Sequence, residues 1–196
     1  MKLDEYYKTH NIKQMDEGYS QEIEGQTNFL KNIVQKHNVK RVMEIGFNGG
    51  HSAELFLSNN TSIELVSFDI GCHDYVSLGK NFIDKTYPGR HELIIGDSLK
   101  TVPKYDKTKG LFDIIFIDGG HKYPISKGDL MNCKRLSHTN TIVIMDDTMN
   151  TKKWIKPWNT GPTRSWNEAI QEGSIEAMGS EDYKVGRGQS WGKYII

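Results

Sequence analysis

The chain has 196 residues and carries 25 Lys and Arg side chains against 25 Asp and Glu, so its formal net charge is zero. This balance disfavours a dominant electrostatic attraction to nucleic acid or to an anionic membrane, and we expect neither as a partner. No apolar run reaches the roughly 20 residues that span a bilayer, and the first residues lack the hydrophobic segment of a secretory signal. The two cysteines are expected as free thiols. These features favour a cytoplasmic protein with one core.

Predicted helices and strands alternate along the chain. Residues 20–37 show the apolar spacing of an amphipathic helix. Five short β-branched runs follow, and each has the length of a strand that is buried on both faces: 41–45, 63–68, 91–95, 112–117 and 141–145. The longer stretches between them suit crossover helices, including one over 125–136. This alternation predicts an α/β doubly wound sheet.

The two ends of the chain differ from this central pattern. Residues 1–18 are polar and tyrosine-bearing, which suits a loose arm or a short helix. The tail after Thr148 is rich in tryptophan, with a short helix expected at 164–172 and a last strand at 190–196. We therefore expect one domain in three parts: an N-terminal arm and helix (1–38), a ligand-binding core (39–147), and a lid with terminal strands (148–196).

An acidic residue ends or directly follows each of the five predicted strands: Glu44, Asp69, Asp97, Asp118 and Asp146. If the strands are parallel, these carboxylates meet at one edge of the sheet, which is where open α/β sheets bind ligands. A row of acids there is unfavourable unless it holds hydroxyls, a cation or a metal. The pattern therefore predicts a binding site.

A glycine-rich turn follows the first predicted strand and runs from Glu44 through Gly46, Phe47, Asn48 and Gly50 to Ser52. Glycines let the backbone approach a ligand closely. The spacing does not fit the G-x-G-x-x-G dinucleotide fingerprint, and an acid precedes the first glycine, which disfavours a pyrophosphate. An ordinary tight turn is the alternative.

Two further sites follow the next strands. A carboxylate at Asp69 can accept both hydroxyls of a ribose, and Asp97 with Ser98 is placed to meet an adenine edge. Each of these positions also suits a helix cap or a turn.

Taken together and in this order, these motifs resemble those of the class I S-adenosylmethionine-dependent methyltransferases. The resemblance covers residues 40–147 and implies about seven mostly parallel strands in a Rossmann-like sheet, with an antiparallel C-terminal strand. It implies that Glu44, Gly46 and Gly50 surround the methionine end of the cofactor. It also implies that Asp69 holds the ribose, and Asp97 with Ser98 the adenine. The residues expected to bind cofactor are Glu44, Gly46, Phe47, Asn48, Gly50, Ser52, Asp69, Asp97, Ser98 and Asp118.

The acids after the fourth and fifth strands resemble those of the metal-dependent O-methyltransferases, and especially the sugar type. Asp118, Asp146 and Asp147 can supply oxygens to Mg²⁺ or Mn²⁺. Catechol-type enzymes carry a lysine where this chain has His121, and an asparagine where it has Asp147. Alternatives remain: the aspartate pair could cap a turn, and His121 could be a loop histidine or face the adenine.

We therefore expect an O-methyltransferase that acts on a hydroxyl of a small molecule such as a sugar or glycoside. A divalent cation would acidify the hydroxyl, and His121 would take its proton as general base. One alternative is a metal-independent methyltransferase for a nitrogen or nucleic-acid acceptor, and another is a non-enzymatic nucleoside-binding module. Whether the chain forms a homo-oligomer stays open.

Overall fold

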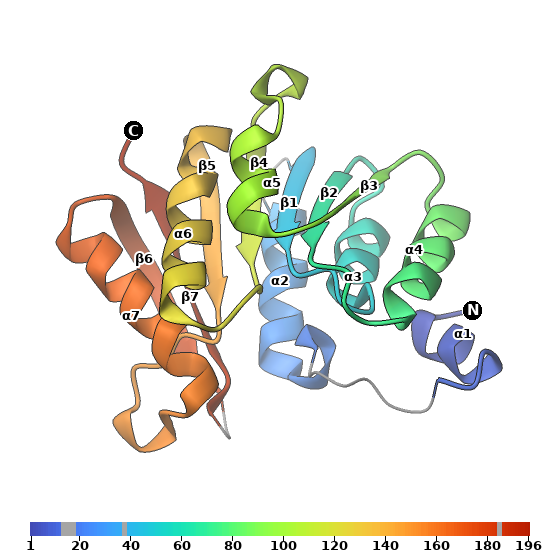
Figure 1. The fold of residues 1–196 in the computed structure, drawn as a ribbon, viewed down its shortest axis with the longest axis horizontal. Helices are drawn as coiled ribbons and strands as arrows, with labels where there is room; N and C mark the ends of the chain where they lie inside the picture. The colour runs from blue at the N-terminus through green and yellow to red at the C-terminus, as the bar shows by residue number, and fades with distance from the viewer. Residues whose placement is uncertain (13–18, 37–38, 184–185) are drawn as a thin grey trace.

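The computed structural model describes residues 1–12, 19–36, 39–183 and 186–196. Its centre is a seven-stranded sheet in the order β3-β2-β1-β4-β5-β7-β6 (Figure 1). The first five strands pair in parallel, and β7 pairs antiparallel with both β5 and β6. The strands are β1 (Arg41–Ile45), β2 (Glu64–Asp69), β3 (His91–Ile95), β4 (Phe112–Ile117), β5 (Ser137–Asp146), β6 (Ile175–Asp182) and β7 (Gly188–Tyr194).

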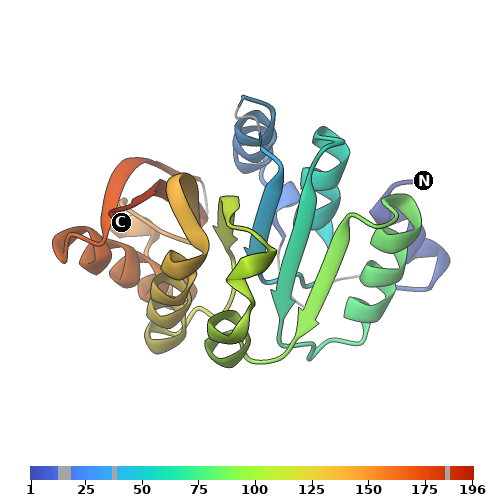
Figure 2. The ribbon, with the colours of Figure 1, turned by 90° about the horizontal axis from the view of Figure 1, so that it is seen from above.

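Helices cover both faces of the sheet, as Figure 2 shows from above. The helices are α1 (Leu3–Thr9), α2 (Glu24–Lys36), α3 (His51–Asn59), α4 (Tyr75–Thr86), α5 (Ser98–Lys104), α6 (Tyr123–Cys133) and α7 (Pro157–Gln171). Short 3₁₀ turns lie at Ser20–Glu22, Lys107–Lys109, Lys134–Leu136 and Lys152–Trp154.

Alternate residues of the central strands enter two separate hydrophobic cores. Val42 and Ile114 pack with apolar side chains of α1 to α4 on one face. Met43 and Ile115 pack with side chains of α5, α6 and α7 on the other face. Because side chains of a strand point alternately to opposite faces, a continuous apolar run supplies both cores.

The predicted strands and the doubly wound class are confirmed. The expectation that each strand is buried on both faces is wrong for β3, which lies at an edge of the sheet and has no fully buried residue. The fifth strand begins earlier than predicted, at Ser137, and α7 begins at Pro157 rather than at residue 164. The last strand ends at Tyr194. Strand β6 had no assigned range, because seven of its eight residues are not buried and no apolar alternation marks it. Part of the expected N-terminal arm, residues 13–18, lies outside the described residues.

The parallel register brings the carboxyl ends of the strands to one edge. Ile45 pairs with Phe68 on one side and with Ile117 on the other, and Ile117 pairs with Met145. The residues after these strand ends therefore share one edge of the sheet, as the sequence predicts.

Candidate active site at the carboxyl edge of the sheet

The glycine turn after β1 is held between its neighbours. The backbone N–H of Gly46 donates to the carbonyl of Phe68, 2.8 Å away, and the N–H of Asp118 donates to the carbonyl of Ile45 at 2.9 Å. Gly46 has φ +98°, and a Cβ there would collide with the carbonyl of Asp118. The position therefore requires glycine for its conformation and for this close approach.

Glu44 lies beneath this turn and is fully buried. One carboxylate oxygen accepts the hydroxyl hydrogen of Ser52 at 2.7 Å, and the other accepts that of Ser67 at 2.6 Å. Burial raises the pKa of Glu44 to about 7, the two serine hydrogen bonds oppose that shift, and Asp69 adds to it. Glu44 therefore supports the turn from below instead of lining the main cavity.

A cavity of about 650 Å³ opens along the carboxyl edge. Eight of the predicted site residues line it: Gly46, Asn48, Asp69, Asp97, Ser98, Asp118, His121 and Asp147. Phe47 and Ser52 line a much smaller recess beside Tyr19 and His51. Gly50 lines neither space and serves as the left-handed N-cap of α3, with φ +84°.

The two acids predicted to hold the nucleoside also have local partners. Asp69 accepts the N–H of Asn48 at 2.8 Å and the N–H of Gly71 at 2.6 Å, which ties the glycine turn to the loop after β2. Asp97 caps α5 by accepting the N–H of Leu99 at 3.1 Å. A helix cap and a ligand contact can coexist, since a carboxylate has four lone-pair sites.

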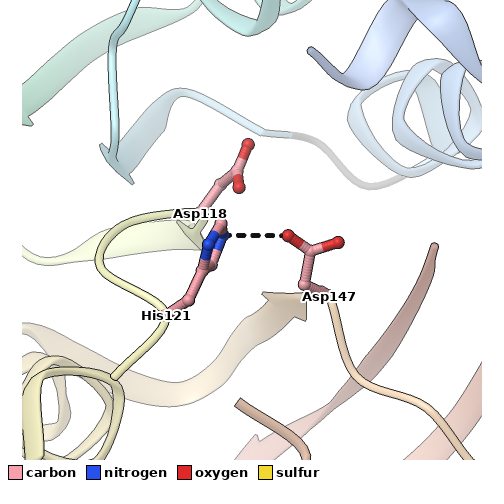
Figure 3. Close-up of side chains that lie close together, drawn as sticks. All are labelled: Asp118, His121 and Asp147. Atoms are coloured by element: carbon pink, nitrogen blue, oxygen red, sulfur yellow. Dashed lines mark ion pairs between the residues drawn. The ribbon is translucent and has the colours of Figure 1, made fainter. Parts of the chain in front are cut away.

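Asp118, His121 and Asp147 come together on the other side of the cavity (Figure 3). One ligand atom from each lies within 4.8 Å of the others. Nε2 of His121 is 2.9 Å from Oδ2 of Asp147. Asp147 has a left-handed backbone, with φ +52°, and such strain in a residue other than glycine is most common at functional sites.

Asp146 does not join this group. It is 2% exposed, and its Oδ1 accepts the side-chain amide of Gln26 at 2.6 Å. Its Oδ2 has no hydrogen-bond partner among the described residues. Of the predicted metal ligands, the structure thus brings Asp118 and Asp147 together beside the predicted base His121, and leaves Asp146 apart.

Arg187 is a site residue that the sequence pattern did not reveal. It lies just before β7, lines the main cavity, and places its Nε 3.4 Å from Oδ1 of Asp147. A single arginine 40 residues beyond the aspartate pair carries no motif, so only the pairing of β5 with β7 brings it here. Trp158, in the first turn of α7, also lines the cavity and is 39% exposed.

The crowded carboxylates perturb one another. Burial raises the pKa of Asp118 well above its usual range, and the charges of Asp146 and Asp147 raise it further, while Arg187 opposes the shift. Burial and Asp147 likewise raise the pKa of Asp146. A bound divalent cation would relieve this repulsion, because it favours the ionised form of each ligand.

The donor set fits such a cation. The carboxylates of Asp118 and Asp147 suit Mg²⁺ or Mn²⁺ with water completing the shell, and His121 lies beside them. Oδ1 of Asp147 accepts no hydrogen bond from any described residue, so it has a lone pair to offer.

A family model described as a methyltransferase domain matches residues 43–148, more than half of the chain. The chain belongs to this family. It is a class I S-adenosylmethionine-dependent methyltransferase, as the order of its motifs and its sheet predict. Comparison with curated protein sequences finds no significant match.

Solved structures with the same fold include several O-methyltransferases. An O-methyltransferase from Bacillus cereus, in complex with SAH, has a TM-score of 0.73 at 19% identity, covering 97% of this chain and 90% of that one. SAH-bound PaMTH1 from Podospora anserina has a TM-score of 0.74 at 17% identity, covering 99% and 88%. CalS11, described as a TDP-rhamnose 3'-O-methyltransferase, has a TM-score of 0.65 at 17% identity, covering 89% and 82%.

The described part of the chain contains no helix with the length and hydrophobicity needed to cross a bilayer.

Proposed function

We propose that this methyltransferase transfers the methyl group of S-adenosylmethionine to a hydroxyl of a small molecule, with a divalent cation and His121 assisting. One observation carries the proposal: Asp118, His121 and Asp147 converge on the same cavity as the acids assigned to the cofactor. A ligand at that cluster therefore lies within reach of a cofactor in the cavity.

In this proposal the cofactor lies along the carboxyl ends of β1, β2 and β3. Gly46 and Asn48 contact its methionine end, and Ser52, Phe47 and Gly50 shape the recess and the turn behind it. Asp69 accepts the ribose hydroxyls, and Asp97 with Ser98 contacts the adenine. Glu44 acts through Ser52, whose hydroxyl it accepts at 2.7 Å.

The acceptor then occupies the space between His121 and Trp158. A second groove of about 470 Å³ begins at His121 and continues past Tyr123, Pro157 and Arg164, so it extends the acceptor side. The exposed rings of Pro157 and Trp158 suit the apolar face of a sugar or a glycoside. CalS11, which has the same fold, is described as a methyltransferase for TDP-rhamnose, and this sugar acceptor supports the choice.

Methyl transfer to an alcohol requires loss of the hydroxyl proton. In this proposal His121 accepts it. Its side chain is 44% exposed, and its Nε2 lies 2.9 Å from the Asp147 carboxylate, whose negative charge stabilises an imidazolium. A bound Mg²⁺ would lower the pKa of the acceptor hydroxyl, with Asp118 and Asp147 as its carboxylate ligands and Asp146 as a further candidate after a side-chain turn.

Metal depletion tests the cation. SAH release should be measured with a panel of sugars and glycosides, before and after EDTA and again after Mg²⁺ or Mn²⁺ is restored. We expect loss and recovery of turnover. Turnover that a chelator leaves unchanged would remove the metal from the proposal without removing the methyltransferase.

His121→Ala tests the base. We expect kcat to fall roughly 10²- to 10⁴-fold, as is typical for loss of a general base, while the Kd for SAH stays within a factor of about two of wild type. His138→Ala is the control, since His138 pairs with Asp113 at the opposite end of the strands. Near-normal turnover of His121→Ala would leave this histidine a structural role.

A metal-independent reaction is the second candidate, and Arg187 favours it. Its guanidinium already offsets part of the negative charge at Asp147, 3.4 Å away. In that case the same EDTA experiment would leave turnover intact. The family assignment leaves the non-enzymatic nucleoside-binding module without support.

A further inference from the structure

Asp129 is a buried carboxylate that the proposed reaction does not use. It lies on α6, is fully buried, and forms no hydrogen bond of normal geometry with any residue that the structure describes. Buried acids are almost always paired, because an ionised carboxylate away from water is unfavourable. A buried carboxylate without a partner, such as that of Asp129, is therefore a candidate for a functional role.

The position of Asp129 gives that reason. A Cβ placed on Gly119, the residue after Asp118, would lie 3.2 Å from Oδ2 of Asp129. The hydroxyl of Ser98 is also close enough to favour the ionised form of Asp129. Gly119 and Ser98 both line the cofactor cavity, whereas Asp129 lies behind its wall. The carboxyl group thus touches the adenine side and the loop that carries Asp118 and His121.

Helix packing supports this placement. A side chain at Gly128 would collide with Leu99, so the glycine lets α6 approach the start of α5 closely. That approach brings Asp129 next to Ser98. No cation balances Asp129: it forms no ion pair with any described residue. Burial raises its pKa to about 6, the Ser98 hydroxyl opposes the shift, and the negative charge of Asp97 adds to it.

We propose that Asp129 is a positioning residue for cofactor binding, one that joins the adenine seat to the loop after β4. When the cofactor is bound, the carboxylate accepts the hydroxyl of Ser98 and a backbone N–H of the Gly119–Gly120 turn. Neither the N–H of Gly119 nor that of Gly120 donates a hydrogen bond to the backbone carbonyl of a described residue. Cofactor binding would complete the partners of Asp129 and fix the loop that carries His121.

The inference rests on the cofactor site proposed above. It predicts that removing the charge of Asp129 changes stability and cofactor affinity in opposite directions. Asp129→Asn removes a buried charge without partners, so its Tm at pH 8 should equal or exceed that of wild type. The same change removes one acceptor, so the Kd for SAH should rise tenfold or more. A purely structural role would move stability and affinity in the same direction, or would leave affinity unchanged.

The experiment measures Tm by calorimetry and the Kd for SAH by isothermal titration, on the full chain at pH 8. Ser126→Ala is the matched control on the same helix: Ser126 is buried and its hydroxyl lies 2.8 Å from that of Ser165, away from the cofactor cavity. It should lower Tm and leave the Kd for SAH unchanged. Asp129→Ala provides a second variant with the same expected loss of affinity.

A double-mutant cycle with Ser98→Ala locates the effect. If Asp129 acts through Ser98, the two substitutions together should weaken SAH binding by at least threefold less than the product of their separate effects. An unchanged Kd in Asp129→Asn, or a loss of Tm that accompanies its loss of affinity, would overturn the inference. Absence of SAH binding by the wild-type protein would instead overturn the cofactor seat, and the inference with it.

Discussion

At the scale of single residues, Glu44 shows how burial changes the chemistry of the site. Its two oxygens accept hydroxyl hydrogens from Ser52 and Ser67, and Oγ of Ser67 also lies 2.8 Å from Nε2 of His91. Burial raises the pKa of Glu44 from its usual 4.5 to about 7, which the serine hydrogen bonds only partly counteract. Glu44 therefore keeps its proton to a higher pH than an exposed glutamate does.

This shift predicts a pH dependence of stability. Between pH 4.5 and 7 the folded protein holds a proton on Glu44 that the unfolded chain has lost. The contribution of Glu44 to stability is therefore full below about pH 4.5 and decreases as the pH rises to about 7. Glu44→Gln lacks this decrease. The free energy of unfolding of the variant minus that of wild type should therefore be larger at pH 8 than at pH 5, by up to about 3 kcal/mol.

Urea unfolding of both proteins at the two pH values, without cofactor, measures this gain. Asp129 and Asp146 also have raised pKa values, but they are present in both proteins and cancel in the difference. An equal difference in stability at pH 5 and pH 8 would mean that Glu44 ionises normally in the fold.

At the scale of elements, the strands were the easiest part to predict. Runs such as Ile114–Ile117 enter both hydrophobic cores, so their apolar character is continuous and unmistakable. Strand β6 is at the edge of the sheet and mostly unburied, so its sequence carries no such signal. Helix α7 contains Pro157 and Pro162, which predict a turn. Pro157 is the first residue of the helix, where proline is tolerated. Gly161 lets the helix pack closely against the backbone carbonyl of His121.

Two glycines with positive φ permit a test at this scale: Gly46, in the turn between β1 and α3, and Gly89, in the loop between α4 and β3. Gly89→Ala places a side chain at φ +74° where no atom lies within 4 Å, so it should destabilise the fold by only ~1–2 kcal/mol. Gly46→Ala adds a collision with the carbonyl of Asp118, and should be worse than Gly89→Ala by about 1–3 kcal/mol.

Chemical denaturation of the two variants compares them directly, because both share the backbone strain and differ in the collision. Gly46→Ala should also weaken SAH binding, whereas Gly89→Ala should not. Equal stabilities would show that the loop after β4 can move away from the glycine turn.

At the scale of the whole molecule, the strand order 3-2-1-4-5-7-6 places β1 beside both β2 and β4. The cofactor acids and the Asp118–His121–Asp147 cluster consequently share one cavity. A ligand that bridges this edge contacts loops from most strands of the sheet, so its binding should stabilise the whole fold.

SAH at about 100 times its Kd should raise the free energy of unfolding by roughly 2.7 kcal/mol. For a chain of this size that corresponds to an increase in Tm of roughly 5–10 °C. A thermal shift assay measures the increase. Asp69→Ala should reduce it at the same SAH concentration, and NAD should produce none. A shift with NAD but not with SAH would contradict the cofactor assignment.

The sequence by itself determined the class of fold, the positions of the five parallel strands and the acids that follow them. It could do so because buried strands and tight glycine turns are specified by residues close together in the chain. It also named eight residues that line the cavity, since a motif at a strand end must lie at the carboxyl edge of a parallel sheet.

Only the tertiary structure decided which of these residues meet. Asp146 and Asp147 are neighbours in sequence, yet the left-handed backbone of Asp147 turns its carboxylate toward His121 while Asp146 faces Gln26. Arg187 and Asp129 join the site through strand pairing and helix packing across 40 and 31 residues of chain. Such contacts depend on side-chain direction and on long-range register, which no local pattern encodes.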